Sequence, residues 1–168
     1  TFHKYDGFGE ENRRYLGYVS NSASDGSFKY TAPLEQYLFY HNAENIAHTD
    51  WAFSEVELEN SPRKRVLSEA AIGKSWVGEN RKVVYEKSFN SQNDDIKLIK
   101  VNALGELIVA DIYKDNELLI EKTTDEQGDI VLTYTNKVGK KILVRAELGN
   151  NTFTETYFVY NRLGLLAY

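Results

Sequence analysis

The sequence of 168 residues predicts a mainly β fold, an antiparallel meander of hairpins with one or two short helices in its N-terminal half. The first observation behind this prediction is a turn signal, Asp or Asn followed three residues later by Gly, that occurs five times. The second is that each copy follows an aromatic or β-branched residue, the types enriched in strands. The third is a high content of tyrosine, 12 residues, whose ring suits a half-buried pleated surface.

The turn signal has a physical basis in both of its residue types. The side chain of Asp or Asn can accept hydrogen bonds from the backbone two residues further on, and Gly supplies the positive φ that closes the turn. We therefore expect a hairpin turn at each copy and a positive φ at its glycine. The five copies, with the preceding tyrosine where there is one, are Tyr5-Asp6 to Gly9, Asn102 to Gly105, Asp125 to Gly128, Asn136 to Gly139, and Tyr160-Asn161 to Gly164.

Residues 80–168 are the more regular half and are expected to form a β-meander with these turns. Its runs of apolar, β-branched and aromatic residues have strand length. Segment 152–160 begins with polar residues on one face and ends in four apolar or aromatic residues. Both faces of its end are therefore expected to be covered. The expected strands are 82–87, 96–101, 107–113, 130–134, 142–147, 152–160 and the short 165–168.

Residues 1–79 read as a strand followed by an excursion of loops and short helices, with one strand at 53–58, and the whole chain, 1–168, as a single β-rich repeat-type domain. The segment 33–41 has apolar residues at helical spacing, and its proline suits the first helical turn. Ser61 and Pro62 favour the start of a second helix, expected to run from Pro62 to Ala71 and to end before a glycine.

Composition excludes several classes of function. The net charge of −5 argues against binding a nucleic acid backbone, which requires a basic surface. No apolar run approaches the roughly 18–20 residues of a membrane-spanning helix, and the absence of cysteine removes thiolate metal sites. The chain also lacks methionine and a signal peptide, so we expect it to be a piece of a longer protein.

No cofactor site is expected either. Gly7 and Gly9 form a Gly-x-Gly pattern, but neither a third glycine nor a strand-to-helix context follows, as a dinucleotide site requires.

Several of these segments, in this order, resemble the RHS (rearrangement hot spot) family and its Tyr-Asp repeat, in the form found at the start of the repeat region in large proteins of Bacteroidetes. The resemblance covers about residues 5–168. Its residues are Tyr5-Asp6-Gly7-Phe8-Gly9, Ser61 to Leu67 followed by Gly73 and Trp76, and Thr156 to Gly164.

The resemblance implies a structural role without catalysis. In that family, repeats wind as a continuous β-sheet into a hollow shell that encloses or presents a C-terminal toxin or other cargo, and the whole protein is secreted or displayed on the cell surface. The implied partners are further repeats of the same polypeptide and the enclosed C-terminal domain, and no cofactor is implied. Hairpins that cannot bury their apolar faces alone need such neighbours.

Two groups of side chains are candidates for catalysis or metal binding. His41, His48 and Asp50 lie close together in the sequence, but their spacing matches no recognised zinc motif, so a loop histidine and a helix-face histidine are the plainer interpretation.

Paired carboxylates are the second group. The pair Asp94 and Asp95, or Glu55, Glu57 and Glu59, could serve glycoside hydrolysis only by facing each other across a cleft. The three glutamates alternate with apolar residues, which favours the solvated face of a strand. We therefore expect no enzyme.

The alternative function is a β-rich cell-surface module that binds carbohydrate. Trp51, Trp76 and the tyrosines could form a platform on which a sugar stacks, although a core position for the tryptophans is the plainer interpretation. The basic run Arg63-Lys64-Arg65 fits a solvated helix start better than a nucleic-acid contact in so acidic a chain.

Overall fold

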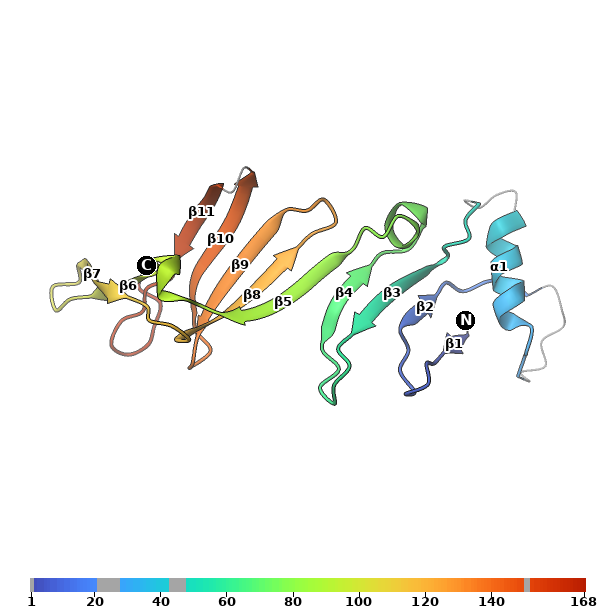
Figure 1. Cartoon of the computed structure of the whole chain (residues 1–168), viewed down its shortest axis with the longest axis horizontal. Helices are drawn as coiled ribbons and strands as arrows, with labels where there is room; N and C mark the ends of the chain where they lie inside the picture. Colours follow the sequence, from blue (N-terminus) through green and yellow to red (C-terminus); the bar gives the residue numbers. More distant parts are fainter. Residues whose placement is uncertain (1, 21–27, 43–47, 150–151) are drawn as a thin grey trace. The chain divides into compact units, whose positions relative to one another are not determined.

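The computed structural model describes residues 2–20, 28–42, 48–149 and 152–168. Of these residues, 42% lie in strands and 12% in helices, and hydrogen-bonded strands follow each other in chain order, so the predicted mainly β, antiparallel meander is confirmed (Figure 1). The chain divides into two compact units, Thr1–Val84 and Tyr85–Tyr168. No helix in the described ranges is both long and apolar enough to cross a membrane.

The first unit is a small antiparallel sheet with one α-helix. Strand β2 pairs with β1 and β3, β3 with β4, and β4 with the first residues of β5. The elements are β1 (His3–Lys4), β2 (Arg13–Tyr15), α1 (Ala32–Asn42), β3 (Phe53–Leu58), β4 (Val66–Ala70), the π-helical turn η1 (Lys74–Gly78) and the start of β5 (Val83–Phe89).

Two of the expected elements of this unit are confirmed. Strand β3 has the expected bounds, and α1 contains the predicted helix 33–41. The helix is attached through its polar face: the buried Gln36 donates from Nε2 to the carbonyl of Ala52 at 3.1 Å, and Tyr40 donates from Oη to the carbonyl of Gly17 at 2.6 Å. The polar run Ser20 to Ser27, whose composition favours a loop, lies outside the described residues except for Ser20.

The helix predicted from Pro62 to Ala71 is wrong, because this segment forms a turn and then strand β4. The turn is closed by Lys64, whose φ of 47° is left-handed, and the N–H of Glu59 donates to the carbonyl of Arg65 at 2.7 Å. Beyond the turn, Ser68 and Ala70 are buried while their neighbours are exposed. This alternation of period two is that of a half-buried strand, and pairing with β3 on one side outweighs the capping signal at Ser61.

The core of the first unit is small. Phe53, Ala70 and Val77 form its buried cluster, against which Tyr15 and Trp51 pack. The turn η1 brings Gly78 so close to the indole of Trp51 that an added Cβ would lie 2.9 Å from Nε1. A side chain at this position would therefore displace the tryptophan ring.

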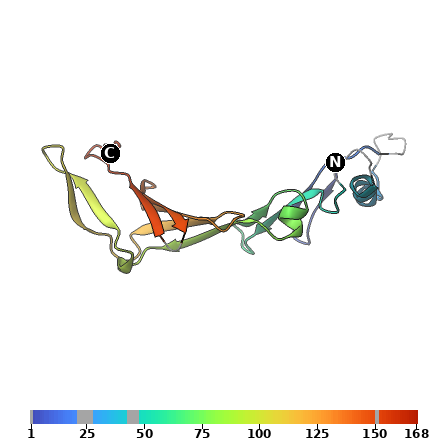
Figure 2. The same cartoon turned by 90° about the horizontal axis from the view of Figure 1, so that it is seen from above.

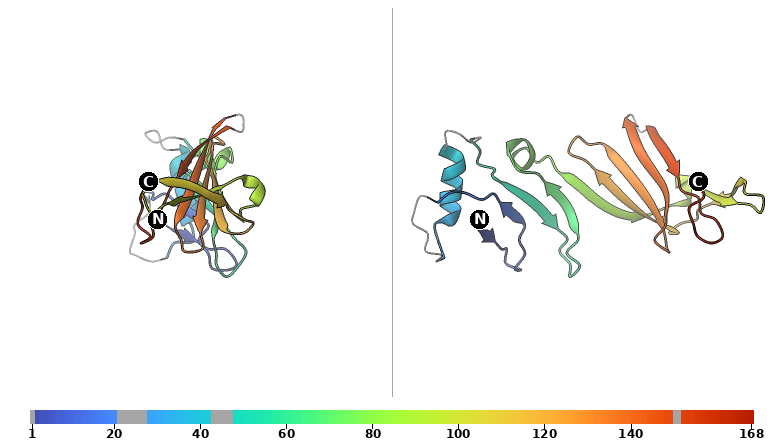
Figure 3. Two further views of the ribbon diagram at one scale, coloured as in Figure 1. Left: turned by 90° about the vertical axis from the view of Figure 1, so that its left-hand side faces the viewer. Right: turned by 180° about the vertical axis from the view of Figure 1, so that it is seen from behind.

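The second unit is built from consecutive hairpins. In its main sheet β8 pairs with β9, β9 with β10 and β10 with β11, and the strands follow one another in chain order (Figure 3, right). A separate hairpin, β6–β7, is turned away from this sheet (Figure 2, yellow-green). The elements are the rest of β5, the 3₁₀ turn η2 (Gln92–Asp94), β6 (Lys97–Val101), β7 (Leu107–Ile112), β8 (Leu118–Thr124), β9 (Ile130–Asn136), β10 (Lys141–Gly149) and β11 (Thr152–Tyr157).

The core of the second unit is larger and lies against one face of β8–β10. Tyrosines and a leucine pack around its buried cluster, so the predicted covering of the end of segment 152–160 is observed. The prediction of a strand at 165–168 is wrong, because this segment forms only a single bridge, between Leu166 and Tyr160. The buried cluster comprises Ile96, Leu118, Ile120, Tyr134, Ile142 and Leu143.

Candidate functional site

The five predicted turns share one hydrogen-bonding pattern. In each, the Oδ1 of the Asp or Asn accepts two backbone N–H groups, those of the second and the fourth residue after it, at 2.8–3.0 Å. The glycine N–H donates to the carbonyl of the Asp or Asn at 2.9–3.2 Å, and that residue's own N–H donates to the carbonyl after the glycine at 2.9–3.0 Å. Four hydrogen bonds therefore close each turn.

The closing glycines have the predicted left-handed conformation. Their φ angles lie between 77° and 96°, in the order 79°, 84°, 96°, 81° and 77° for Gly9, Gly105, Gly128, Gly139 and Gly164. Asp and Asn serve equally as the acceptor, and at Asp6 the backbone N–H groups of Glu10 and Phe8 lower the pKa of the carboxyl. The turns therefore share one geometry whichever residue starts them.

The two tyrosines that precede a turn lie in different surroundings. Tyr5 is 60% exposed, whereas Tyr160 packs against the core of its unit. The Nζ of Lys140 lies 4.7 Å from the centre of the Tyr160 ring, and Tyr160 donates from Oη to the carbonyl of Lys141 at 3.0 Å. The tyrosine of the last turn is thus held by contacts that the first one lacks among the described residues.

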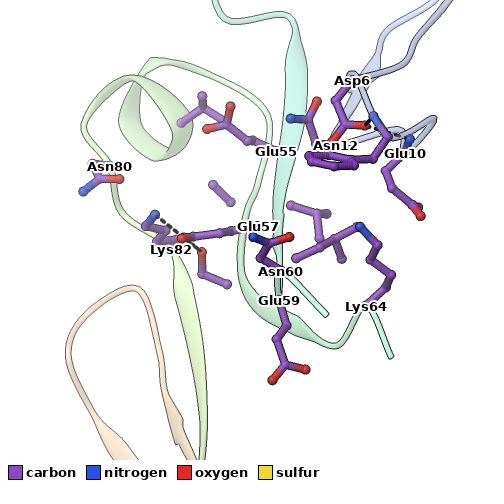
Figure 4. Close-up of a pocket in the computed structure, with 16 residues that line it drawn as sticks. Asp6, Glu10, Asn12, Glu55, Glu57, Glu59, Asn60, Lys64, Asn80 and Lys82 are labelled. Atoms are coloured by element: carbon purple, nitrogen blue, oxygen red, sulfur yellow. Dashed lines mark hydrogen bonds and ion pairs between the residues drawn. The ribbon is translucent and has the colours of Figure 1, made fainter. Parts of the chain in front are cut away.

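A polar cavity of about 360 Å³ lies in the first unit (Figure 4). It is bounded by the β1–β2 turn, strand β3, the β3–β4 turn and the residues that follow η1. The three candidate glutamates, Glu55 and Glu57 of β3 and Glu59 just after it, all line it, together with carboxamides and two lysines. The polar lining residues are Asp6, Glu10, Asn12, Glu55, Glu57, Glu59, Asn60, Lys64, Ser68, Asn80 and Lys82.

Each of the three glutamates has a partner of opposite charge. Glu55 Oε1 accepts from Arg13 Nε at 2.7 Å. Glu57 Oε2 accepts from the hydroxyl of Ser68 at 2.9 Å and from Lys82 Nζ at 3.3 Å.

Glu59 accepts two hydrogen bonds from the guanidinium of Arg65, at 2.9 and 2.7 Å. These bonds lower the pKa of Glu59 to about 2, and the Ser68 hydroxyl, followed by Lys82, lowers the pKa of Glu57. A general acid must carry a proton near neutral pH. Both carboxylates are instead held ionised, which suits the pairing of strands and not proton donation.

The histidine candidates form hydrogen bonds within the protein. His41 Nδ1 lies 2.6 Å from Asp50 Oδ1, and His48 Nδ1 lies 2.7 Å from the carbonyl oxygen of His41. His41 and Tyr37 stack, with ring centres 5.3 Å apart. The described residues contain no group of three or more His, Cys, Asp or Glu side chains placed to hold a metal ion.

The aspartate pair caps a turn. Asp94 Oδ2 accepts the backbone N–H of Ser91 at 2.8 Å in a capping box at the start of η2, and Asp95 ends that turn with a φ of 50°. Sequence reasoning missed this role, although Ser91 followed three residues later by Asp94 is the signal of a capping box.

The tryptophans and the basic run also have structural surroundings. Trp51 is partly buried against Phe53, with ring centres 6.0 Å apart, and Trp76 is partly buried. Lys64 lies over the ring of Phe8, 5.1 Å from its centre. The run at 63–65 therefore lies in the β3–β4 turn, where Lys64 contacts Phe8 of the β1–β2 turn. It does not start a helix as expected.

A family model described as "Domain of unknown function (DUF6443)" matches residues 1–89. The chain belongs to this family. The DUF6443 match covers β1 to β5 and therefore includes the polar cavity and the β3 ion pairs. No curated protein and no solved structure matches the chain.

Proposed function

We propose that this chain is a non-catalytic structural segment of a large secreted or surface-displayed RHS-type protein. In this proposal its hairpins form part of a β-sheet wall that encloses or presents a C-terminal toxin or other cargo. Its partners are the strands that precede and follow it in the same polypeptide.

The observation that carries the proposal is the shared geometry of the five turns. Each turn closes with the same four hydrogen bonds, and four of the five join two paired antiparallel strands, while the fifth, Asn161 to Gly164, is followed by a single bridge. A module repeated in this way extends a sheet by one strand at a time, and each added strand supplies the neighbour that the previous one needs.

The outermost strands support the same role. Among the described residues, β1 pairs only with β2, and β11 pairs only with β10. Edge strands that stay in solvent are normally protected by proline, lysine or bulges within the strand. Strand β11 has one charge, Glu155, and neither proline nor lysine. In a continuous wall its outer edge pairs with the next strand.

The side-chain pairing in the polar cavity supports the same role. Glu55, Glu57 and Glu59 form ion pairs with Arg13, Lys82 and Arg65, and the pKa values of Glu57 and Glu59 lie below their ordinary range, as expected for carboxylates that link neighbouring segments of a sheet.

Cryo-electron microscopy of the full-length protein in its own gene context tests the proposal. We expect density in which β11 is followed by a further paired strand and in which the sheet surrounds a cavity that holds the C-terminal domain. A map in which these residues form a separate module on a linker, with the outer edge of β11 in solvent, would overturn the proposal.

A further inference from the structure

A second cavity, of about 250 Å³, lies within the second unit. Four aromatic side chains and two lysines line it, and no Asp or Glu is among its lining residues in the described part of the chain. These lysine and aromatic residues are Lys97, Tyr113, Lys140, Tyr157, Phe158 and Tyr160.

The aromatic rings are held in place by the core. Tyr113, Tyr157 and Tyr160 pack against the buried cluster on one side and line the cavity on another. The hydroxyl of Tyr157 accepts the backbone N–H of Lys97 at 3.3 Å, which joins β11 to the start of β6. Burial raises the pKa of both Tyr113 and Tyr157, so their hydroxyls stay protonated near neutral pH and can donate.

Lysines lie near these rings: Lys97 and Lys140 line the cavity, and Lys141 lies beside it. Lys140 lies over the ring of Tyr160, and Lys141 lies 5.7 Å from the ring centre of Phe158. Lys97 forms no ion pair within the described residues. The cavity is therefore a local basic site in a chain whose net charge is −5.

Two carboxylates act on the tyrosines from nearby, and both are already engaged. Glu117 accepts the backbone N–H of Lys114 at 2.9 Å, and Glu155 accepts from Arg145 Nε at 2.7 Å. Neither lines the cavity. Lys140 Nζ donates to the carbonyl of Gly164 at 2.8 Å, and no carboxylate among the described lining residues neutralises the charge of Lys97 or Lys140.

We propose that this cavity binds an acidic saccharide through one uronic acid residue. The carboxylate of the sugar pairs with the lysine ammonium groups, its C–H face lies against the tyrosine rings, and its hydroxyls bond the phenol groups. Charge-assisted hydrogen bonds give such a site its preference for an anion, and the volume of the cavity suits one sugar unit and not a longer segment.

The backbone around the cavity favours a saccharide over an acidic peptide. The N–H of Phe158 donates to the carbonyl of Ile142 at 2.9 Å, and that of Val159 donates to the carbonyl of Tyr168 at 3.0 Å. An extended peptide needs unpaired backbone groups to bind as an added strand, whereas a sugar acid needs ring faces, hydroxyls and ammonium groups. The proposal does not depend on the structural role of the chain.

The test is a nuclear magnetic resonance titration of the whole chain with an α-1,4-linked galacturonic acid trisaccharide, at neutral pH and constant ionic strength. The comparison ligands are a neutral galactose trisaccharide of the same linkage and a glutamate tripeptide of similar charge. We expect shifts at residues around the cavity with the sugar acid, and binding at least tenfold weaker with either comparison ligand.

Two matched variants locate the site. Lys97→Gln and Lys100→Gln remove the same charge from the same strand, β6, but only Lys97 lines the cavity. We expect Lys97→Gln to weaken binding about tenfold, the loss of one charge-assisted contact, and Lys100→Gln to weaken it less than twofold. Well-dispersed spectra of both variants show that they fold.

The proposal is overturned if the sugar acid does not bind, if the neutral sugar or the peptide binds equally well, or if the two variants weaken binding to the same extent.

Discussion

The two units of this chain use the same kind of hairpin but stabilise it in different ways. The second unit contains four of the five turns and a buried cluster of six apolar residues. The first unit contains one such turn and a cluster of three. Its glutamates Glu55, Glu57 and Glu59 form ion pairs with Arg13 of β2, with Lys82 just before β5 and with Arg65 just before β4. The hairpins of the second unit thus pack on a shared buried cluster. The first unit has a smaller cluster and adds side-chain ion pairs and the close contact between Gly78 and Trp51.

The largest expected effect is that of replacing a core residue of the second unit, and it distinguishes the stability of one unit from that of the other. Leu143 is fully buried in the second unit. Replacing it with alanine removes apolar contact and leaves a cavity, which costs about 2–5 kcal/mol of unfolding free energy. Hydrogen-exchange mass spectrometry should show faster exchange in β8–β10 of Leu143→Ala, with little change in β3 and β4. Equal acceleration in both units would contradict the division into two separately stabilised cores.

The next effect concerns a close contact in the first unit. In Gly78→Ala the new Cβ meets the Trp51 ring, and such overpacking costs about 1–3 kcal/mol. Both tryptophans of the chain, Trp51 and Trp76, lie in this unit, so fluorescence-detected urea unfolding reports on it directly. The control is Gly7→Ala, where a Cβ meets no atom within 4 Å. An unchanged midpoint for Gly78→Ala would show that the tryptophan is not packed on this glycine.

A smaller effect is expected at the turns of the second unit. Gly139 has a φ of 81° and open space around its Cβ position, so a substitution there changes backbone strain alone. Gly139→Val should cost about 1–2 kcal/mol, measured by urea unfolding with circular dichroism detection. Gly139→Asn should cost less, because asparagine adopts the left-handed conformation more readily. Equal stability of the valine variant and the parent would refute the turn assignment.

The smallest effect concerns an ion pair of the first unit and depends on pH. The folded-state pKa of Glu59 is about 2, below its ordinary value of 4.5. Its pairing with Arg65 therefore stabilises the fold above the ordinary pKa, and this contribution is lost as the pH falls from about 4.5 to 2. The melting temperature of Glu59→Gln should lie below that of the parent at pH 6.5 and converge with it near pH 2.

The control for this variant is Glu126→Gln, which removes the same charge from a side chain without an ion pair among the described residues. A gap between parent and Glu59→Gln that persists unchanged at pH 2 would contradict the assigned pairing.

The regular unit was also the one that could be predicted from sequence. In residues 80–168 the turn signal and the apolar runs act over a few residues, so local chemistry placed the ends of β6, β7, β9 and β10 to within two residues, although strand β8 was not expected. The end of the chain was less predictable, because Leu166 bridges to Tyr160 through a contact that no local pattern encodes.

The first unit was harder to predict because non-local pairing decided it. Ser61 and Pro62 favour a helix start locally, but Ser68 and Ala70 are buried only when β4 lies beside β3. The candidate site shows the same contrast between what local sequence predicts and what non-local pairing decides. The solvated face of β3 was predicted, whereas the partners of its glutamates, Arg13 and Lys82, come from other strands and carry no local signal.

The proposal that this chain is one section of a longer sheet is best tested by amide hydrogen exchange at β11. The measurement compares the isolated chain with the full-length protein from the same gene. We predict that amides of Thr152–Tyr157 that exchange quickly in the isolated chain become strongly protected in the full-length protein, while those of β8 and β9 change little. Equal, fast exchange of those β11 amides in both proteins would show that no strand follows β11, and would contradict the account.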